Sequence, residues 1–444
     1  MPKNTASLPP SAGEPNSAGA LRPGVRPREV WAWAMYDFAN SGYTTVVITA
    51  IFSAYFVGVV AGKSAWATFA WTAALSLSYL FNLLSAPLLG AWADAHRGKK
   101  KLLALSTAGC VLGTAGLALS GPGDVALAIV FIVISNFCFA TGENLIAAFL
   151  PELADEDNLG KVSGWGWSLG YVGGLVSLGA CLAWVTWAEA RGDTAAQFVP
   201  VCMLITALLF ALSSAPTFLF LRERSTLKPL AEGRAWRRLR ATLQHARQYR
   251  DMRRFMLCIV FYQAGIQAVI ALAAIYAEQA MGFSTTESIM LIFLVNITAA
   301  LGAFGFGYWQ DRLGYVRAIA LTLAGWIAMI VLAWAATTPP LFWVAANIAG
   351  LCLGASQSAG RALVGYLAPA ERHAEFFGLW GLAVKFSSIL GPLTYGVVTW
   401  ATDGNHRLAI LATGTYFVVG LLVLSGVDAA RGRRAALANG AASD

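Results

Sequence analysis

The sequence of 444 residues is poor in charge and in the residue patterns that build catalytic, metal or nucleotide sites. Charged residues make up 12% of the chain, about half of the roughly 25% that is usual in soluble domains. The six cysteines form no CxxC pair, and the four histidines show no metal-ligand spacing. A Walker A motif is also missing. We therefore expect no metal, no cofactor and no nucleotide-driven activity.

Long apolar runs dominate the chain instead, because 57% of its residues are hydrophobic. Charges, Gly/Pro clusters and polar turns divide it into twelve apolar segments, each near the about 20 residues that a helix needs to cross a membrane. The sequence thus predicts an all-α polytopic membrane protein. The segments are approximately 38–60, 66–92, 102–120, 125–150, 162–187, 197–221, 255–280, 287–309, 317–336, 341–367, 374–400 and 406–427.

The basic residues are distributed very unevenly between the two sides of this arrangement. Twelve crossings place both termini on one side, and 26 of the 31 Lys and Arg residues lie on that side. Three basic residues lie in the opposite loops and two lie inside segments. Positive loops stay in the cytoplasm, so we expect cytoplasmic termini and a place in the cell (inner) membrane. The net charge of +8 is then a topology feature, and a nucleic-acid partner is not expected.

The chain also contains an internal repeat. Asp94 and Asp311 each stand four residues after a glycine. Pro151 and Pro369 each close an apolar segment, and their separation along the chain matches that of the two aspartates to within one position. Two landmarks with nearly the same offset indicate a duplicated six-helix unit. The predicted organisation is a disordered cytoplasmic tail at 1–30, an N-terminal half at 31–221, a basic cytoplasmic linker at 222–254, a C-terminal half at 255–427 and a cytoplasmic tail at 428–444.

Each half carries a full charge eight residues before its landmark proline: Glu143 in the first half and Arg361 in the second. Lys385 lies about 18 Å into a segment, twelve residues after His373. Charges at such depth face a partner or a wet cavity. One reading is a central solute site in which Glu143 carries a proton; the other is an interhelical salt bridge that only locks the bundle. Two cations face one obvious anion unless Asp37 is the second.

Further polar residues share faces with these charges. Asp37 and Asn40 lie on one helix face, either at the membrane surface or along the pathway. Gln357 is one turn before Arg361, and Asn144 follows Glu143. The predicted substrate-binding or coupling residues are Glu143, Arg361, Lys385, Asp37, Asn40, Gln357, Asn144, Asn82 and Gln263.

The loop motif G-x-x-x-D-R-x-G after the second segment of each half resembles the major facilitator superfamily. The first copy departs from the motif, because Ala95 replaces the arginine and the glycine arrives one residue late at Gly98. The resemblance implies two rigid halves that alternately expose one site, with this motif as a cytoplasmic gate. The gate residues it assigns are Gly90, Asp94, Arg97, Gly307, Asp311, Arg312 and Gly314.

Three further stretches narrow the resemblance. They are YDFANSGY at 36–43, FLPEL at 149–153 and FFGLWGLAVKFSSILGP at 376–392. Together they are similar to the "unknown major facilitator" family, which includes the yeast autophagy-related vacuolar amino-acid effluxer. The resemblance covers about 31–427.

We therefore expect a monomeric secondary transporter and not an enzyme. It would move a small polar or zwitterionic solute, such as an amino acid, across the lipid bilayer with a proton or another coupling ion. The alternatives are a transport-fold sensor or scaffold, and a facilitator for sugars or peptides. A membrane enzyme would need a nucleophile–base pair or metal ligands near an interface, and we find neither. Import and export are left open.

Overall fold

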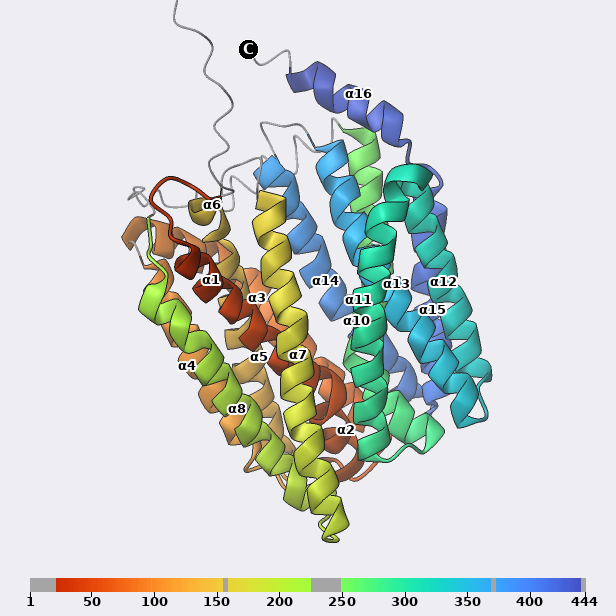
Figure 1. The fold of residues 1–444 in the computed structure, drawn as a ribbon. Coiled ribbons are helices and arrows are strands. Elements are labelled where there is room, and N and C mark those ends of the chain that lie inside the picture. Colours follow the sequence, from red (N-terminus) through yellow and green to blue (C-terminus); the bar gives the residue numbers. More distant parts are fainter. Residues whose placement is uncertain (1–20, 97, 155–158, 225–248, 369–372, 441–444) are drawn as a thin grey trace, which may run out of the picture.

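A computed structural model describes residues 21–96, 98–154, 159–224, 249–368 and 373–440. The regular secondary structure of the described chain is helical, apart from an isolated β-bridge between Leu21 and Ala154. Twelve spans in it are long and apolar enough to cross a membrane, which confirms the predicted polytopic α-helical fold. In Figure 1 the helices of the first half, coloured red to yellow-green, lie on the left, and those of the second half, green to blue, lie on the right.

The first membrane span, 27–60, is not a regular α-helix, because it contains two π-helical stretches on either side of a short α-helical turn. Such π-helical insertions are frequent at functional sites. The first-half elements are α1 (Pro27–Tyr43), η1 (Thr44–Ala50), α2 (Phe52–Tyr55), η2 (Phe56–Val60), α3 (Ala67–His96), α4 (Lys99–Leu117), α5 (Val125–Ala147), α6 (Leu150–Leu153), α7 (Leu159–Ala190) and α8 (Ala195–Phe220).

The second half follows after residues outside the described part, so the predicted basic linker is described only at its two ends. Its elements are α10 (Arg250–Met281), α11 (Thr285–Leu313), α12 (Tyr315–Ala335), α13 (Pro339–Leu367), α14 (His373–Ala401), α15 (His406–Leu424) and α16 (Ala429–Gly440).

The first helix begins at Pro27 rather than near residue 38, within the stretch predicted to be a disordered tail. Proline suits the first position of a helix, because it has no N–H to satisfy and its φ is already helical. Glu29, which falls within the predicted disordered tail, is only 2% exposed. It pairs with Arg224 at 2.8 Å, so its charge is compensated at the end of the bundle.

Glycine lets the helices of each half approach closely. A Cβ atom on Gly173 of α7 would collide with the Phe38 carbonyl oxygen of α1. A Cβ atom on Gly391 of α14 would collide in the same way with the Ala264 carbonyl oxygen of α10. Close backbone approach of this kind is how small residues hold membrane helices together.

We therefore expect Gly391→Ala to destabilise the protein by about 1–3 kcal/mol, because the backbone of α10 cannot move aside as a side chain can. The matched control is Gly381→Ala on the same helix, where a Cβ atom would meet nothing within 4 Å. That change removes a helix-interior glycine and should be neutral or stabilising by about 0.5–1 kcal/mol. Thermal unfolding in detergent compares the two variants, and equal melting temperatures would contradict the close contact.

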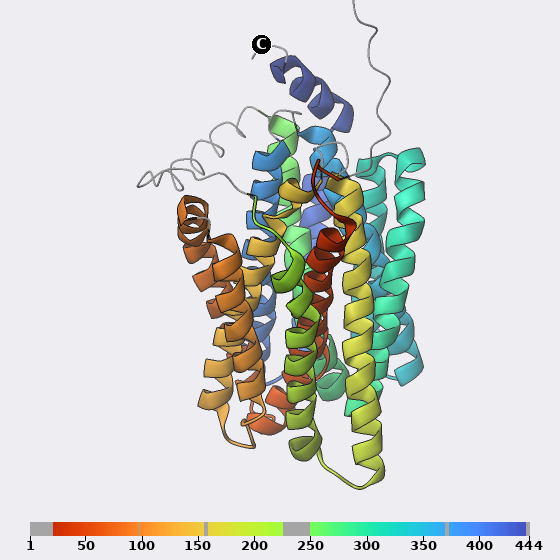
Figure 2. The same ribbon diagram turned by 60° about the vertical axis from the view of Figure 1, so that its left-hand side comes forward.

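The helix α16 marks one end of the bundle, here called the termini end (Figure 1). It lies across the beginning of α10, where the guanidinium of Arg431 donates to the buried Asp251 carboxylate at 2.6 and 2.8 Å. The stretch predicted as a C-terminal tail thus contains a helix, α16, over Ala429–Gly440. The opposite end, here called the hairpin end, carries the turns at 61–66 and 191–194. Figure 2 shows the α7–α8 hairpin as the part that extends furthest there.

The two halves contact each other at the hairpin end. The rings of Phe69 on α3 and Trp400 on α14 stack with their centres 5.4 Å apart. The Thr286 hydroxyl at the start of α11 donates to Glu189 at the end of α7 at 2.7 Å. At the termini end, the ion pairs Arg224–Glu29 and Arg431–Asp251 each stay within one half. The halves are thus joined at the hairpin end.

Candidate solute site between the halves

Four charged side chains from four helices meet where the two halves face each other, between the middle of the bundle and its termini end. Asp37 comes from α1 and Glu143 from α5 of the first half, and Arg361 from α13 and Lys385 from α14 of the second half. The sequence predicted all four as site residues. Here they form one cluster with two charges of each sign, so the cluster is neutral overall.

Glu143 and Lys385 form an ion pair across the two halves. The side chains remain 43% and 18% exposed, so water reaches the pair although it lies within the membrane-spanning part. The Lys385 ammonium also lies 5.7 Å from the centre of the Tyr79 ring on α3. The partner of Glu143 is therefore Lys385, which the sequence alone did not determine.

Arg361 is held by aromatic rings instead of a carboxylate. Its guanidinium carbon lies 5.2 Å from the ring centre of Trp167 on α7 and 5.4 Å from that of Trp380 on α14. Among the described residues, no hydrogen-bond acceptor meets its N–H groups. A guanidinium presents five N–H donors in a plane that matches a carboxylate. These donors are therefore free to bind a ligand.

Asp37 is the second anion of the cluster. Its carboxylate packs so tightly over Gly166 of α7 that a Cβ atom there would collide with it. The charges of Glu143 and Arg361 both act on it, but it has no ion-pair partner within 4 Å in the described part of the chain. The sequence left open whether Asp37 is the second anion, and here it lies in the cluster and balances the second cation. Asp37 and Arg361 are left as opposite charges near each other without a direct contact.

Asn82 and Asn144 bond within the first half. The Asn144 amide donates to the Asn82 carbonyl oxygen at 3.1 Å, and the Asn82 amide donates to the Thr141 hydroxyl at 3.1 Å. These contacts join α3 to α5 and use the side chains that the sequence assigned to the solute. They hold α5, which carries Glu143, against α3.

Gln263 and Asn40 are buried polar residues with unused hydrogen-bonding atoms. The Gln263 amide donates to the Gln357 carbonyl oxygen at 3.2 Å, one helical turn from Arg361. Gln263 is only 1% exposed and its own carbonyl oxygen has no partner in the described chain. Asn40 is 7% exposed, and within the same described ranges neither its amide nitrogen nor its oxygen has one. Unpaired buried polar atoms are costly, so these positions are ready for ligand or water.

The predicted cytoplasmic gate lies almost wholly outside the described residues. This holds for Arg97 and for the side chains of Asp94, Asp311 and Arg312, as well as for Gly90 and Gly307. Gly314 is described: it joins α11 to α12 with a φ of +81°, a conformation that favours glycine. The gate motif therefore stays a prediction.

The sequence reasoning missed the aromatic residues of the site. Trp167, Trp380 and Tyr79 surround the two cations. Tryptophan and tyrosine are common at both membrane surfaces, so residue type alone gave no reason to single these out.

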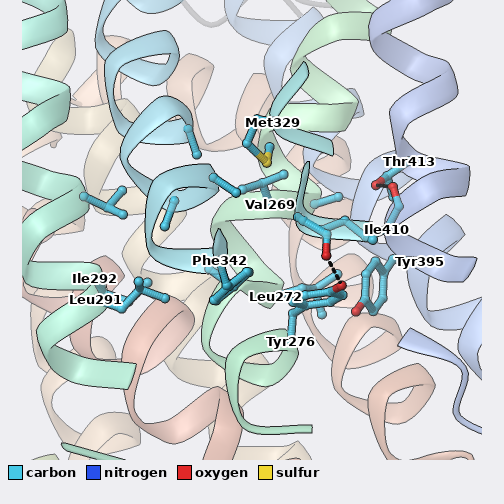
Figure 3. A pocket seen from close by; sticks show the side chains of 17 residues that line it. Val269, Leu272, Tyr276, Leu291, Ile292, Met329, Phe342, Tyr395, Ile410 and Thr413 are labelled. Carbon is cyan, nitrogen blue, oxygen red and sulfur yellow. Dashed lines mark hydrogen bonds between the residues drawn. The ribbon is translucent and has the colours of Figure 1, made fainter. Parts of the chain in front are cut away.

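A separate cavity lies inside the second half, toward the hairpin end (Figure 3). Its free volume is about 60 Å³, and it is lined mainly by apolar side chains such as Leu272, Phe342 and Met329. The Tyr276 hydroxyl at its edge already donates to the Ala333 carbonyl oxygen at 2.7 Å. None of the described residues that line the cavity is charged, so it does not suit a charged or zwitterionic solute.

Comparison with solved structures supports the fold. The nucleoside transporter NupG superposes with a TM-score of 0.69 at 14% identity, over 90% of this chain and 98% of that one. A bacterial homologue of the human lysosomal transporter Spinster, in an inward-facing unoccupied state, gives 0.67 at 14% identity, over 93% and 98%. A D-xylose–proton symporter gives 0.66 at 14% identity, over 90% and 97%. These similarities establish a major facilitator fold, and at 14% identity they give no information about the substrate.

Comparison of sequences identifies the family. An uncharacterised major-facilitator-type transporter, YxiO of Bacillus subtilis (strain 168), is 28% identical over 408 residues, 89% of this chain and 93% of that protein. Autophagy-related protein 22 of Kluyveromyces lactis is 27% identical over 219 residues, 45% of this chain and only 43% of the relative. The first of these relatives is named as a transporter, and the matching family model is described as a vacuole effluxer, so the family is one of transporters rather than enzymes. The family model described as "vacuole effluxer Atg22 like" matches residues 55–437, and the chain therefore belongs to this family of multi-pass membrane transporters.

Proposed function

We propose that this protein is a proton-coupled secondary transporter for a small zwitterionic solute, an amino acid or a close relative. The observation that carries the proposal is Arg361, whose N–H groups have no acceptor in the described chain while the Asp37 carboxylate lies near. A solute carboxylate fits the guanidinium fork, and a solute ammonium fits Asp37. Such a solute is neutral overall, so it enters the neutral cluster without leaving a charge uncompensated.

The joined hairpin end and the hydrated Glu143–Lys385 pair support a state in which the site opens toward the termini end. We place this end in the cytoplasm because of the charge bias of the loops. Alternating access then requires the hairpin-end contacts to break and the termini end to close. We further propose that the protein acts as a monomer in the inner membrane.

Proton coupling fits the two carboxylates of the cluster. Asp37 has no ion-pair partner among the described residues, so it is available to take up a proton when no ammonium is bound. Protonation of Glu143 would remove its attraction to Lys385 and loosen one contact between the halves. Either step links a proton to the movement of the halves.

The test starts with a thermal-shift screen of the purified protein against amino acids, small peptides, polyamines, betaines and sugars. A solute present at a hundredfold excess over its Kd should add about 2.7 kcal/mol of stability. Proteoliposomes with an imposed pH gradient should then accumulate the stabilising solute, and a protonophore should abolish accumulation but not exchange. Stabilisation by sugars alone, or accumulation that ignores the protonophore, would contradict the proposal.

A further inference from the structure

The cluster between the halves obeys the internal repeat of the chain. Glu143 and Arg361 are separated along the chain by the same offset as the landmark prolines, Pro151 and Pro369. Trp167 and Lys385 are separated by this offset too. The two residues of each pair therefore occupy equivalent positions, one in the first half and one in the second. Trp167 stands in the first half where Lys385 stands in the second.

Packing within each half confirms that these positions are equivalent. A Cβ atom on Gly142 of α5 would collide with the Tyr36 hydroxyl of α1. In the second half, a Cβ atom on Gly360 of α13 would lie 2.5 Å from the Tyr262 hydroxyl of α10. Gly142 and Gly360 immediately precede Glu143 and Arg361, so both charges leave their helices at the same place in the unit.

The repeat relates two contacts between the halves to each other. Glu143 on α5 contacts Lys385 on α14, and the equivalent residues, Arg361 on α13 and Trp167 on α7, also contact each other. The interface between the halves therefore contains two contacts that the repeat relates to each other. One copy is an ion pair and the other is a cation–π contact.

The two copies differ in what they leave free. The ion pair uses the charge of Lys385 and a carboxylate oxygen of Glu143. In the other copy, the Arg361 guanidinium lies over the ring of Trp167, and it also lies over the ring of Trp380. Neither of these cation–π contacts uses an N–H donor of Arg361. Trp167 is 45% exposed, so its ring is not enclosed by the surrounding helices.

We propose that Trp167 is a positioning residue for Arg361. It holds the Arg361 guanidinium at the interface between the halves. Because Trp167 carries no charge where the repeat places the counter-ion, a solute carboxylate can pair with Arg361 instead. This rests on the proposed function for the identity of the ligand, but not for the contact itself. A carboxylate built into the chain at position 167 would take the vacant place, as Glu143 does for Lys385.

The first test needs no solute. Trp167→Glu supplies the carboxylate, and Trp167→Gln is its uncharged control of the same shape. Each is combined with Arg361→Ala, and melting temperatures of the full-length protein are compared in a double-mutant cycle. We expect Arg361→Ala to lower the melting temperature more with Trp167→Glu than with Trp167→Gln, and this excess to vanish at a pH low enough to protonate the carboxylate. No excess at neutral pH would overturn the proposed contact.

The second test uses the twenty common amino acids singly in thermal-shift assays. Trp167→Phe keeps a ring face and should bind the stabilising amino acid within about threefold of the native protein, whereas Trp167→Leu should bind it about tenfold more weakly. Trp167→Glu should bind it weakest, because its own carboxylate competes. Undiminished binding by Trp167→Glu would overturn the inference alone. If no amino acid raises the melting temperature of the native protein, that result counts against the proposed function. The double-mutant cycle, which needs no solute, would still test the contact between Trp167 and Arg361.

Discussion

Arg361→Ala is expected to abolish both the solute-dependent rise in melting temperature and solute accumulation in proteoliposomes. Loss of one partner of a desolvated, hydrogen-bonded charge pair costs about 2–5 kcal/mol, which weakens binding by at least about 30-fold. Arg361→Lys should be intermediate, because lysine keeps the charge but loses the planar fork. Dissociation constants from isothermal calorimetry would rank the three proteins.

The control for this substitution is Arg253→Ala, which removes an exposed cation of α10 outside the cluster. It should leave both solute binding and transport unchanged. If Arg361→Ala binds the same solute as the native protein does, Arg361 only helps to hold the halves together. The solute site then lies elsewhere.

The second large effect is expected for the ion pair between the halves. Glu143→Lys places a third cation beside Lys385 and Arg361, and Lys385→Glu places a third anion beside Glu143 and Asp37. Each single reversal should lower the melting temperature and abolish transport. The double reversal restores one opposite-charge pair and should recover much of the stability and part of the transport.

The size of this effect is limited by water. A fully buried pair that loses one partner costs about 3–5 kcal/mol, but the Glu143 side chain is 43% exposed. We therefore expect about 1–2 kcal/mol for Lys385→Ala, nearer to the value of partly screened pairs. Melting temperatures of the single and double variants form a charge-reversal cycle. A double variant no more stable than the worse single one would show that the two residues do not attract each other.

Much of the fold could be predicted from the sequence, because lipid penalises exposed backbone groups and charges within each span. Each span must therefore be a long apolar run that can be recognised without knowing its neighbours. Twelve apolar runs predicted twelve spans, and the matching offsets of Asp94–Asp311 and Pro151–Pro369 predicted the duplicated unit. The first span was placed too late because residues 1–30 were predicted to be a disordered tail, whereas α1 begins at Pro27 and buries Glu29. Its partner Arg224, which lies about 195 residues later at the start of the predicted linker, makes the burial of Glu29 possible.

The candidate site was predicted in part. Asp37, Glu143, Arg361 and Lys385 stood out because a charge within a membrane span needs a reason, and the structure brings all four together. Their pairing did not follow from their positions along the chain. Asn82 and Asn144 carry the same polar signature, yet they bond to each other and to Thr141 within the first half.

The sequence by itself determined that this protein is a duplicated twelve-span membrane protein of a transporter family with opposite charges in its two halves. These properties depend on composition, period and repeat, which are present in the unfolded chain. Only the tertiary structure decided that Glu143 pairs with Lys385 and that Trp167 and Trp380 hold Arg361. The reason is geometric, because these residues lie on different helices. Which helix faces meet depends on how the helices pack within each half, as at Gly173 and Gly391, and on how the two halves meet at the hairpin end.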